Sequence, residues 1–394
     1  MRQAPSSEPS ALLLTALATA AGALVANLYY AQPLVASIAP EIGVSQDLAG
    51  SLVSVTQIGY GIGLFFLVSL ADLVENRKLV LLCIAGTTLG LAGTAVAGSP
   101  AVFFVSALAI GVCSTGAQVL IPFLAHLVPE ERRGRVVGNA MGGLLAGIML
   151  ARPASLFIAS SFGWRAVFGA SAVLMVGIGL ALAYLMPRHQ PKAGMHYGRI
   201  LASMWGLLRD MPFLRWRSAY QALLFAAFNL FWTAVPLMLA EHFGLNGHQI
   251  GLFALAGAGG ALAAPIVGRL ADRGHGKAMT AGAMLTLGVS FLGTGWSSIT
   301  AALAILVVLT ILIDAAVQTN QIVSQRIIFT APGHVRGRVN AIYMTLTFAG
   351  GAIGSILGTV TYHAGGWTLT ALTGALAGFL ALALFGLEQR RSRA

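Results

Sequence analysis

The sequence has little charge. Asp, Glu, Lys and Arg make up 9% of its 394 residues, whereas 57% are hydrophobic and the mean hydropathy is +0.83. A water-soluble domain carries about 25% charged residues, because its surface must be hydrated. The shortage of charge excludes most soluble proteins and predicts that lipid is the main solvent of this chain.

Several chemical signatures are also missing. The two cysteines, Cys83 and Cys113, lie in apolar stretches and do not suggest a disulfide framework. No G-x-x-x-x-G-K-S/T motif is present, since Gly276 and Lys277 are followed by Ala278, so ATP-driven pumping is unsupported. The sequence has no H-E-x-x-H motif, and its eight histidines lie near the ends of apolar runs. We therefore expect no metal site and no cofactor.

Apolar runs long enough to cross a bilayer recur along the whole chain, each ended by a short cluster with charge, Pro or Gly. The runs are continuous and do not alternate every second residue, which favours helices over a membrane barrel. The first run is longer than the apolar part of a signal peptide, so we expect it to be retained. Twelve spans are predicted, at residues 11–37, 47–70, 78–97, 101–127, 135–161, 165–186, 216–240, 248–270, 277–297, 299–328, 336–362 and 367–387.

The formal net charge of +11 raises the question of nucleic-acid binding. If both termini lie on one side of the membrane, all of the 23 Lys and Arg residues except Arg152 and Arg165 fall on that side. The positive-inside rule then places both termini in the cytoplasm. The basic charge reflects membrane topology, and no nucleic-acid partner is expected.

The chain repeats itself at an offset of 200 to 203 residues. We therefore expect a first six-helix bundle at 1–186, a cytoplasmic connection at 187–215 and a second six-helix bundle at 216–394. Two such halves with a substrate site between them, near the bilayer midplane, describe a secondary transporter. The matching landmarks are 27–30 with 229–232, Pro33 with Pro236, Gly43 and Gly50 with Gly244 and Gly251, Asp72 with Asp272, 133–136 with 336–339, and 163–164 with 366–367.

Three segments carry a resemblance to a known family. Residues 268–274 read GRLADRG, and residues 69–78 keep the acid and the basic end of the same pattern, with Val68 in place of the leading glycine. Residues 26–34 read ANLYYAQPL. The sequence resembles the major facilitator superfamily in its twelve-span drug/proton antiporter-like branch, and residues 26–34 resemble the first span of its bacterial efflux-type permeases.

This resemblance implies an all-α polytopic membrane protein with the major facilitator fold. It implies a monomer in the bacterial cytoplasmic (inner) membrane that moves a small-molecule substrate by alternating access. It also implies a cytoplasmic gate formed by Asp72 with Arg77 and by Asp272 with Arg273. Ordinary solvation of these loop residues is the alternative.

One acid and one base lie deep inside the predicted spans. Asp314 is about twelve residues, or ~18 Å, from Arg326 at the cytoplasmic end of its span, and Arg152 is ~25 Å from Arg135. A lone charge near the midplane costs roughly 2.5–3.5 kcal/mol, so each should face a partner or a wet cavity. Neither charge is repeated in the other half of the chain.

Three roles are open for these two charges. In the first, Asp314 takes up and releases the coupling proton, and Arg152 modulates its proton affinity. In the second, the two form a static ion pair that specifies helix packing. In the third, Arg152 binds an anionic substrate directly.

Polar and aromatic side chains in the spans around this pair are candidates for the substrate cavity. For each of them, a role in hydrogen bonding between helices explains its presence as well as contact with substrate does. Rings with scattered amides suit a flat or amphipathic organic solute. The candidates are Asn27, Tyr30, Gln32, Gln57, Tyr60, Gln118, Asn229, Trp232, Gln318, Asn320 and Gln321.

The function predicted from the sequence is proton-coupled efflux of small organic compounds by a secondary transporter. A proton-linked importer or a uniporter of a small organic metabolite, anions included, is the alternative within the same fold. A membrane enzyme or a lipid-handling scaffold would need a nucleophile and a base together at depth, and the sequence shows no such pair. The expected partners are therefore a small solute, protons and the lipid bilayer.

Overall fold

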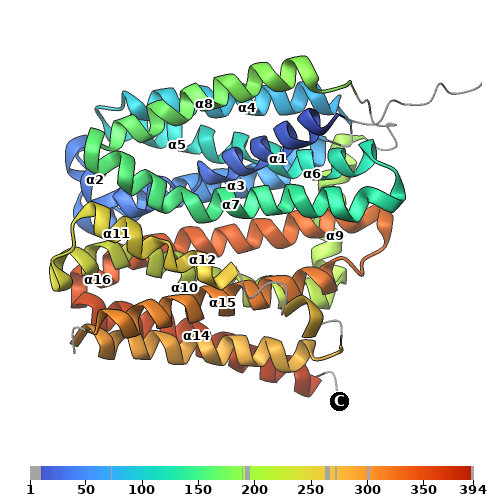
Figure 1. Ribbon diagram of the computed structural model, residues 1–394. Coiled ribbons are helices and arrows are strands. Elements are labelled where there is room, and N and C mark those ends of the chain that lie inside the picture. Colours follow the sequence, from blue (N-terminus) through green and yellow to red (C-terminus); the bar gives the residue numbers. More distant parts are fainter. Residues whose placement is uncertain are drawn as a thin grey trace, which may run out of the picture.

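The computed structural model describes residues 10–71, 73–188, 190, 196–261, 267–270, 273–299 and 302–391. Within these ranges the chain is a bundle of long helices without strands (Figure 1). In the same view the first half of the chain, in blue and green, lies above the second half, in yellow to red. The all-helical structure follows from solvation by lipid, because a helix pairs its own backbone N–H and C=O groups.

Two spans of the first half are interrupted. Span 4 is divided into two helices at Thr115, and span 1 is interrupted after Ala26. The elements are α1 (Ala11–Ala26), η1 (Gln32–Leu34), α2 (Val35–Ile42), η2 (Gln46–Leu48), α3 (Ser51–Leu70), α4 (Asn76–Ala95), α5 (Pro100–Ser114), α6 (Gly116–Leu127), α7 (Glu130–Phe162) and α8 (Trp164–Leu185).

The second half begins after a helix that lies outside the bundle. The elements are α9 (Tyr197–Asp210), α10 (Pro212–Phe243), α11 (Gly247–Ala254), α12 (Ala256–Ala261), α14 (Gly276–Ile299), α15 (Leu303–Ile328) and α16 (Gly333–Arg391). α16 bends at Gly365 and Gly366, where Gly366 has a φ of 62°. This conformation favours glycine, because a side chain would be strained there. The bend divides α16 into two membrane passes.

The number of passes agrees with the sequence. In the described part of the chain, nine helices are long and apolar enough to cross a membrane, and the ninth is the bent α16, which crosses twice. The shorter α1 and the pair α11–α12 occupy the two remaining predicted spans. The predicted class, a twelve-span all-α membrane protein, is confirmed.

The first span differs in detail from the expected continuous run over 11–37. α1 ends at Ala26, and the chain continues through turns to η1, which has Pro33 near its start. Proline has no backbone N–H and cannot continue the helical hydrogen-bond pattern. Its counterpart Pro236 lies inside the unbroken α10. The break turns the side chain of Gln32 into the space between the two halves, where it bonds to Asn229.

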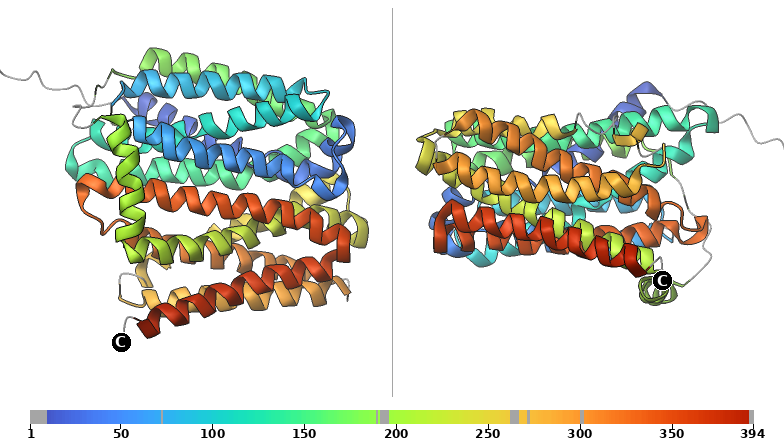
Figure 2. Two further views of the ribbon diagram at one scale, coloured as in Figure 1. Left: turned by 180° about the vertical axis from the view of Figure 1, so that it is seen from behind. Right: turned by 90° about the horizontal axis from the view of Figure 1, so that it is seen from below.

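The bundle has two ends. The first residues of α1 and the last residues of α16 lie at one of them, which we name the terminal end, and the opposite one is the loop end (Figure 1). α9 crosses the terminal end at a steep angle to the spans, as the left view in Figure 2 shows.

The two halves meet along α3 with α16 and along α7 with α11. At the loop end the N–H of Gly50 donates to Thr359 Oγ1 (3.1 Å), and the Thr359 hydroxyl donates to the carbonyl of Asp47 (2.8 Å). A Cβ on Gly50 would lie 2.0 Å from the carbonyl oxygen of Ser355, so only glycine permits this approach. On the second seam, Ser160 and His248 lie 3.2 Å apart. These contacts hold the halves together at the loop end.

Candidate functional site

Six of the predicted site residues come together where the halves meet. They are buried, with at most 4% of each residue exposed. Both halves contribute, because Gln32, Gln57 and Arg152 belong to the first half and Asn229, Trp232 and Asp314 to the second. We call these six residues the central cluster.

A chain of side-chain hydrogen bonds crosses between the halves in this cluster. Arg152 Nε donates to Gln32 Oε1 (2.9 Å), and Gln32 Nε2 donates to Asn229 Oδ1 (3.1 Å). Gln57 Nε2 donates to the same oxygen of Asn229 at 3.1 Å. A second acceptor for Gln32 is Thr233 Oγ1, at 3.5 Å. The amides therefore join α3, α7 and η1 of the first half to α10 of the second.

The Arg152 guanidinium lies among three aromatic rings. Its Cζ atom is 4.9 Å from the ring centre of Tyr29, 5.0 Å from that of Phe228 and 4.7 Å from that of Trp232. Each such contact is worth about 0.5–2 kcal/mol, with the larger values where water is excluded. Its Nη2 atom is buried and has no hydrogen-bond partner. The arginine is held in place, but one of its donors remains uncommitted.

Asp314 and Arg152, both in the described part of the chain, do not form an ion pair within 4.0 Å. Trp232 connects them instead. Its indole Nε1 donates to Asp314 Oδ1 (3.0 Å), while its ring faces the Arg152 guanidinium. The sequence predicted that the two charges lie at similar depth. In the structure the indole ring of Trp232 contacts both side chains.

Gly257 of α12 makes this arrangement possible. A Cβ at Gly257 would lie 2.7 Å from Trp232 Cζ2 and 2.8 Å from Asp314 Oδ2. Contacts this short do not occur in real structures, so a side chain here would displace the indole or the carboxylate.

Sequence reasoning missed four residues of the site: Tyr29, Phe228, Thr233 and Gly257. The first three lie within or directly beside the repeated segments 27–30 and 229–232, so the repeat itself was the available signal. Gly257 belongs to a glycine-rich run that favours close helix contact, but nothing in the sequence links it to Trp232 and Asp314.

The other predicted cavity residues lie outside the central cluster. Gln118 Nε2 donates to the Tyr60 hydroxyl (3.0 Å), and the Tyr60 ring packs on Phe348 of the second half at 4.5 Å. Each of the remaining candidates either bonds to a residue of its own half or has no described bond to the central cluster. Asn27 accepts from Ser171 (2.7 Å), Asn320 donates to Gln221 (2.7 Å), Gln321 lies by Met344 and Tyr343, Gln318 is half-buried with no described bond to the cluster, and Tyr30 lines a groove.

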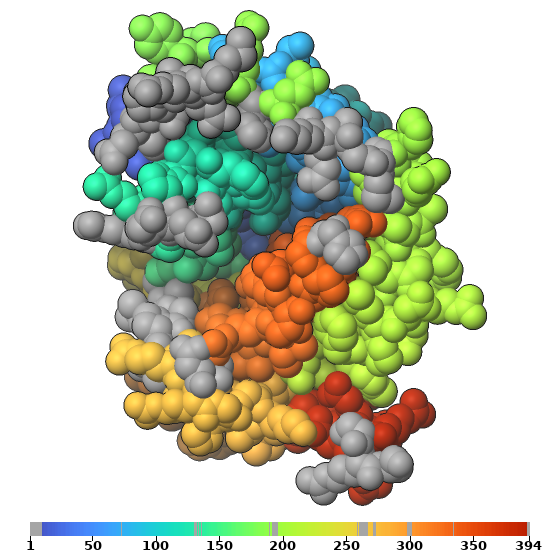
Figure 3. Space-filling view, turned by 90° about the vertical axis from the view of Figure 1, so that its right-hand side faces the viewer, coloured from blue at the N-terminus to red at the C-terminus, as the bar shows by residue number. Residues whose placement is uncertain are grey.

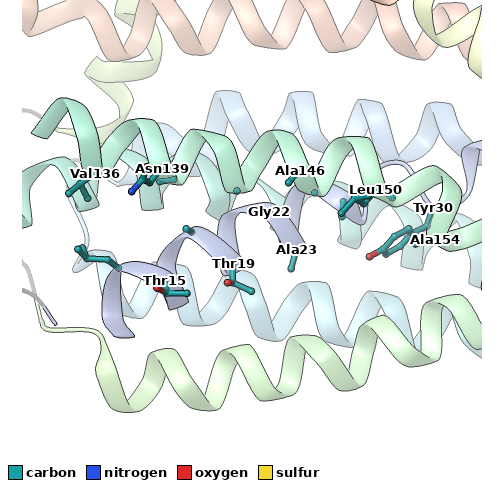
Figure 4. A pocket seen from close by; sticks show the side chains of 17 residues that line it. Thr15, Thr19, Gly22, Ala23, Tyr30, Val136, Asn139, Ala146, Leu150 and Ala154 are labelled. Carbon is teal, nitrogen blue, oxygen red and sulfur yellow. The ribbon is translucent and has the colours of Figure 1, made fainter. Parts of the chain in front are cut away.

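That groove, of about 480 Å³, lies between α1 and α7. Figure 4 shows Thr15 and Thr19 of α1 below Asn139 and Ala146 of α7, with Tyr30 at one end. Arg152 and Asp314 are not part of its lining. The groove is therefore separate from the central cluster.

The predicted gate is only partly visible. Asp72 and Asp272 lie outside the described residues. Arg77 donates to the carbonyl oxygen of Ala183 in α8, and Arg273 is exposed in a turn. The gate therefore stays a prediction.

Comparison with known proteins identifies the family. The family model described as Major Facilitator Superfamily matches residues 12–229 and 218–394. The chain is 36% identical over 372 residues to the putative uncharacterized transporter YgaY of Escherichia coli K12, covering 94% of each protein. It is 26% identical over 284 residues to a chloramphenicol resistance protein of Streptomyces lividans, covering 70% of this chain and 71% of that protein.

Among solved structures, a D-xylose-proton symporter superposes with a TM-score of 0.77 at 16% identity, covering 94% of this chain and 97% of that one. At this identity the likeness concerns the fold alone. Together with the family match, it agrees with the twelve helical passes. The chain belongs to the major facilitator superfamily, a family of membrane transporters and not of enzymes.

Proposed function

We propose that this protein is a proton-coupled exporter of small amphipathic organic compounds, working as a monomer by alternating access. In this proposal it lies in the bacterial cytoplasmic membrane with both termini in the cytoplasm, so that the terminal end faces inward. The observation that carries the proposal is a buried acid, Asp314, linked through Trp232 to a buried arginine between the two halves. Ionisable groups buried at this depth are costly and mark ion or substrate pathways.

The coupling step follows from the contacts of the cluster. When Asp314 is ionised, it attracts Arg152 across the indole of Trp232. Protonation removes this attraction and leaves Arg152 held by Gln32 and the rings. Because Gln32 is also bonded to Asn229 of the other half, a change at Asp314 alters the bonds that join the halves.

The surroundings of the cluster support an amphipathic solute. Rings of Tyr29, Phe228 and Trp232 supply flat apolar surface, while Gln57 Oε1 is buried without a partner and can accept a hydrogen bond. Sites of this kind bind solutes that are mostly apolar with a few polar groups. The chloramphenicol resistance of the Streptomyces relative supports export as the direction.

We further propose that the loop acids Asp72 and Asp272 act with Arg77 and Arg273 as a cytoplasmic gate. Carboxylates near positively charged helix ends and arginines form bonds that can break during a transport cycle. Replacing Asp72 by Asn should reduce transport while leaving solute binding to the central cluster intact.

The test of the proposed function uses purified protein in liposomes with a pH-sensitive dye inside. Chloramphenicol and a series of flat, amphipathic solutes are added, and proton movement is recorded for the wild type, for Asp314→Asn and for Asp47→Asn. Asp47 is an exposed acid at the loop end and serves as the matched control. We expect solute-driven proton flux in the wild type and the control, but not in Asp314→Asn. Solute movement without proton flux in the wild type, or normal coupling in Asp314→Asn, contradicts the proposal.

The second candidate, proton-linked import of a small anion, is favoured by one observation. Arg152 Nη2 is a buried donor without a partner, which suits a carboxylate. An anion would bind better when Asp314 is neutral, whereas an exported solute that competes with the proton would bind worse. Solute affinity measured over roughly pH 5 to 8 separates the two candidates by the sign of its slope.

A further inference from the structure

The connection between the halves contains a helix with two different faces. α9 runs along one edge of the terminal end, as the yellow-green segment at the right of Figure 3 shows. It packs against α3, α10 and α16. The Tyr197 hydroxyl donates to the carbonyl of Phe66 in α3 (3.0 Å), and Arg338 of α16 donates to Ser203 Oγ (2.5 Å). α9 is therefore fixed to both halves at the level where the spans end.

The inner face of α9 is part of an apolar cluster. Met204 is 1% exposed and packs with Leu214, Val339 and Tyr343. Ile200, one turn earlier, is 5% exposed. The packed face gives the helix a defined rotation, which also defines the face it presents outward.

The outer face of α9 carries arginine and tryptophan. Arg199, Ala202, Trp205 and Arg209 are exposed and follow each other at spacings of three and four residues, which places them on one side of the helix. Trp205 is 74% exposed, although it is the largest apolar side chain of the segment. An exposed tryptophan between two arginines is typical of the membrane–water interface, where the indole lies at the headgroup level.

The charges of this face are not neutralised by the protein. Within the described residues, no ion pair involves Arg199, Arg209 or Arg215. Arg215 Nη1 donates to the backbone carbonyl of Arg209 (2.5 Å), which draws its guanidinium to the C-terminal end of α9. The only acid of the helix, Asp210, is exposed beside them and does not pair with any of the three. The face therefore keeps an excess of positive charge.

We propose that the outer face of α9, made by Arg199, Trp205, Arg209 and Arg215, docks on the phosphate headgroups of anionic lipids. α9 lies at the perimeter of the bundle and not over its centre, so the layer beside this face is the headgroup layer. That this layer is the cytoplasmic leaflet rests on the orientation given under the proposed function. Each arginine near such a surface gives about a fivefold preference for anionic over zwitterionic lipid, and all three together about a hundredfold.

The test uses the full chain in lipid nanodiscs with a brominated lipid as a minor component, since bromine quenches tryptophan fluorescence on contact. The brominated lipid is phosphatidylglycerol in one sample and phosphatidylcholine in the other, at equal mole fraction. The signal of Trp205 is the difference between the wild type and Trp205→Phe. We expect stronger quenching by the anionic lipid in the wild type. We expect this preference to fall about fivefold in each of Arg199→Gln, Arg209→Gln and Arg215→Gln.

The matched control is Arg390→Gln/Arg391→Gln, which removes two basic residues from the same end of the bundle, at the end of α16. This variant should keep the preference of Trp205 for anionic lipid. Equal quenching by the two lipids, or an equal loss of preference in the control, overturns the proposal. Because a nanodisc has the same lipids on both sides and no transport is measured, the result does not depend on the direction of transport or on the orientation of the chain.

Discussion

The strongest test of the central cluster is a double-mutant cycle on its two charges. Asp314→Asn removes the negative charge but keeps an oxygen that can accept the Trp232 indole bond, and Arg152→Gln removes the positive charge. Each single variant leaves the other charge buried without a counter-charge, since both side chains are only 4% exposed. Leaving a buried charge without its counter-charge costs up to about 3–5 kcal/mol, the value for a buried ion pair in direct contact.

The interaction free energy between the two charges, which the double-mutant cycle measures as their coupling, has an upper bound. Two unit charges at 4 Å interact by about 4 kcal/mol at an effective dielectric constant of 20, and the attraction falls as the distance grows. Arg152 and Asp314 lie beyond 4.0 Å with the indole of Trp232 between them. We therefore expect a coupling of about 1–3 kcal/mol, so the double variant is more stable than the sum of the two singles predicts.

The assay is thermal unfolding of the four proteins in one detergent at one pH. A coupling of this size corresponds to about 2–6 °C between the observed and the additive melting temperature of the double variant. The exposed pair Arg165–Glu41 at the loop end is the control, because its side chains are 41% and 50% exposed. Its coupling should stay below about 1 kcal/mol. If the changes in melting temperature caused by Asp314→Asn and Arg152→Gln are additive, the two charges do not interact across Trp232. The proposed mechanism of proton coupling is then wrong.

Three further predictions concern separate parts of the molecule. Gly257→Ala should lower stability by about 1–3 kcal/mol and abolish solute-driven proton flux, because its methyl group displaces the indole or the buried acid, and thermal unfolding and flux assays will show both. Thr359→Val leaves the buried N–H of Gly50 without its acceptor, which costs about 1–3 kcal/mol. The labelling rate of a cysteine introduced at the loop end should therefore rise at least about fivefold. An unchanged labelling rate rules out this contact as a bond that closes the loop end. The hydrogen bond from the Arg165 guanidinium lowers the pKa of Glu41 from 4.5 in the folded protein. The ion pair therefore stabilises the fold at pH values above the pKa that Glu41 has in the unfolded chain. This stabilisation is lost as the pH falls through the lower pKa of Glu41 in the folded protein. The melting temperatures of wild type and Glu41→Gln should therefore differ by a constant amount near neutral pH and converge below about pH 4; a difference that persists in acid contradicts this reasoning.

The sequence by itself determined the membrane class, the number of passes and the repeat. Lipid forces every backbone polar group to be paired within the chain, so long apolar runs have one stable local structure, whatever they pack against. The similar depth of Asp314 and Arg152 along their helices also followed from the sequence, because helical rise converts residue number into distance along the helix. Gln32, Gln57, Asn229 and Trp232 were predictable as candidates because polar and aromatic side chains stand out within apolar spans.

The tertiary structure decided how these side chains meet. The break of the first span after Ala26, which directs Gln32 toward Asn229, depends on packing, since the matching Pro236 leaves α10 intact. The insertion of Trp232 between the two charges needs a glycine at position 257, on a different helix. Contacts between residues more than fifty positions apart depend on the rotation and approach of whole helices, and no local pattern in the chain encodes those two quantities.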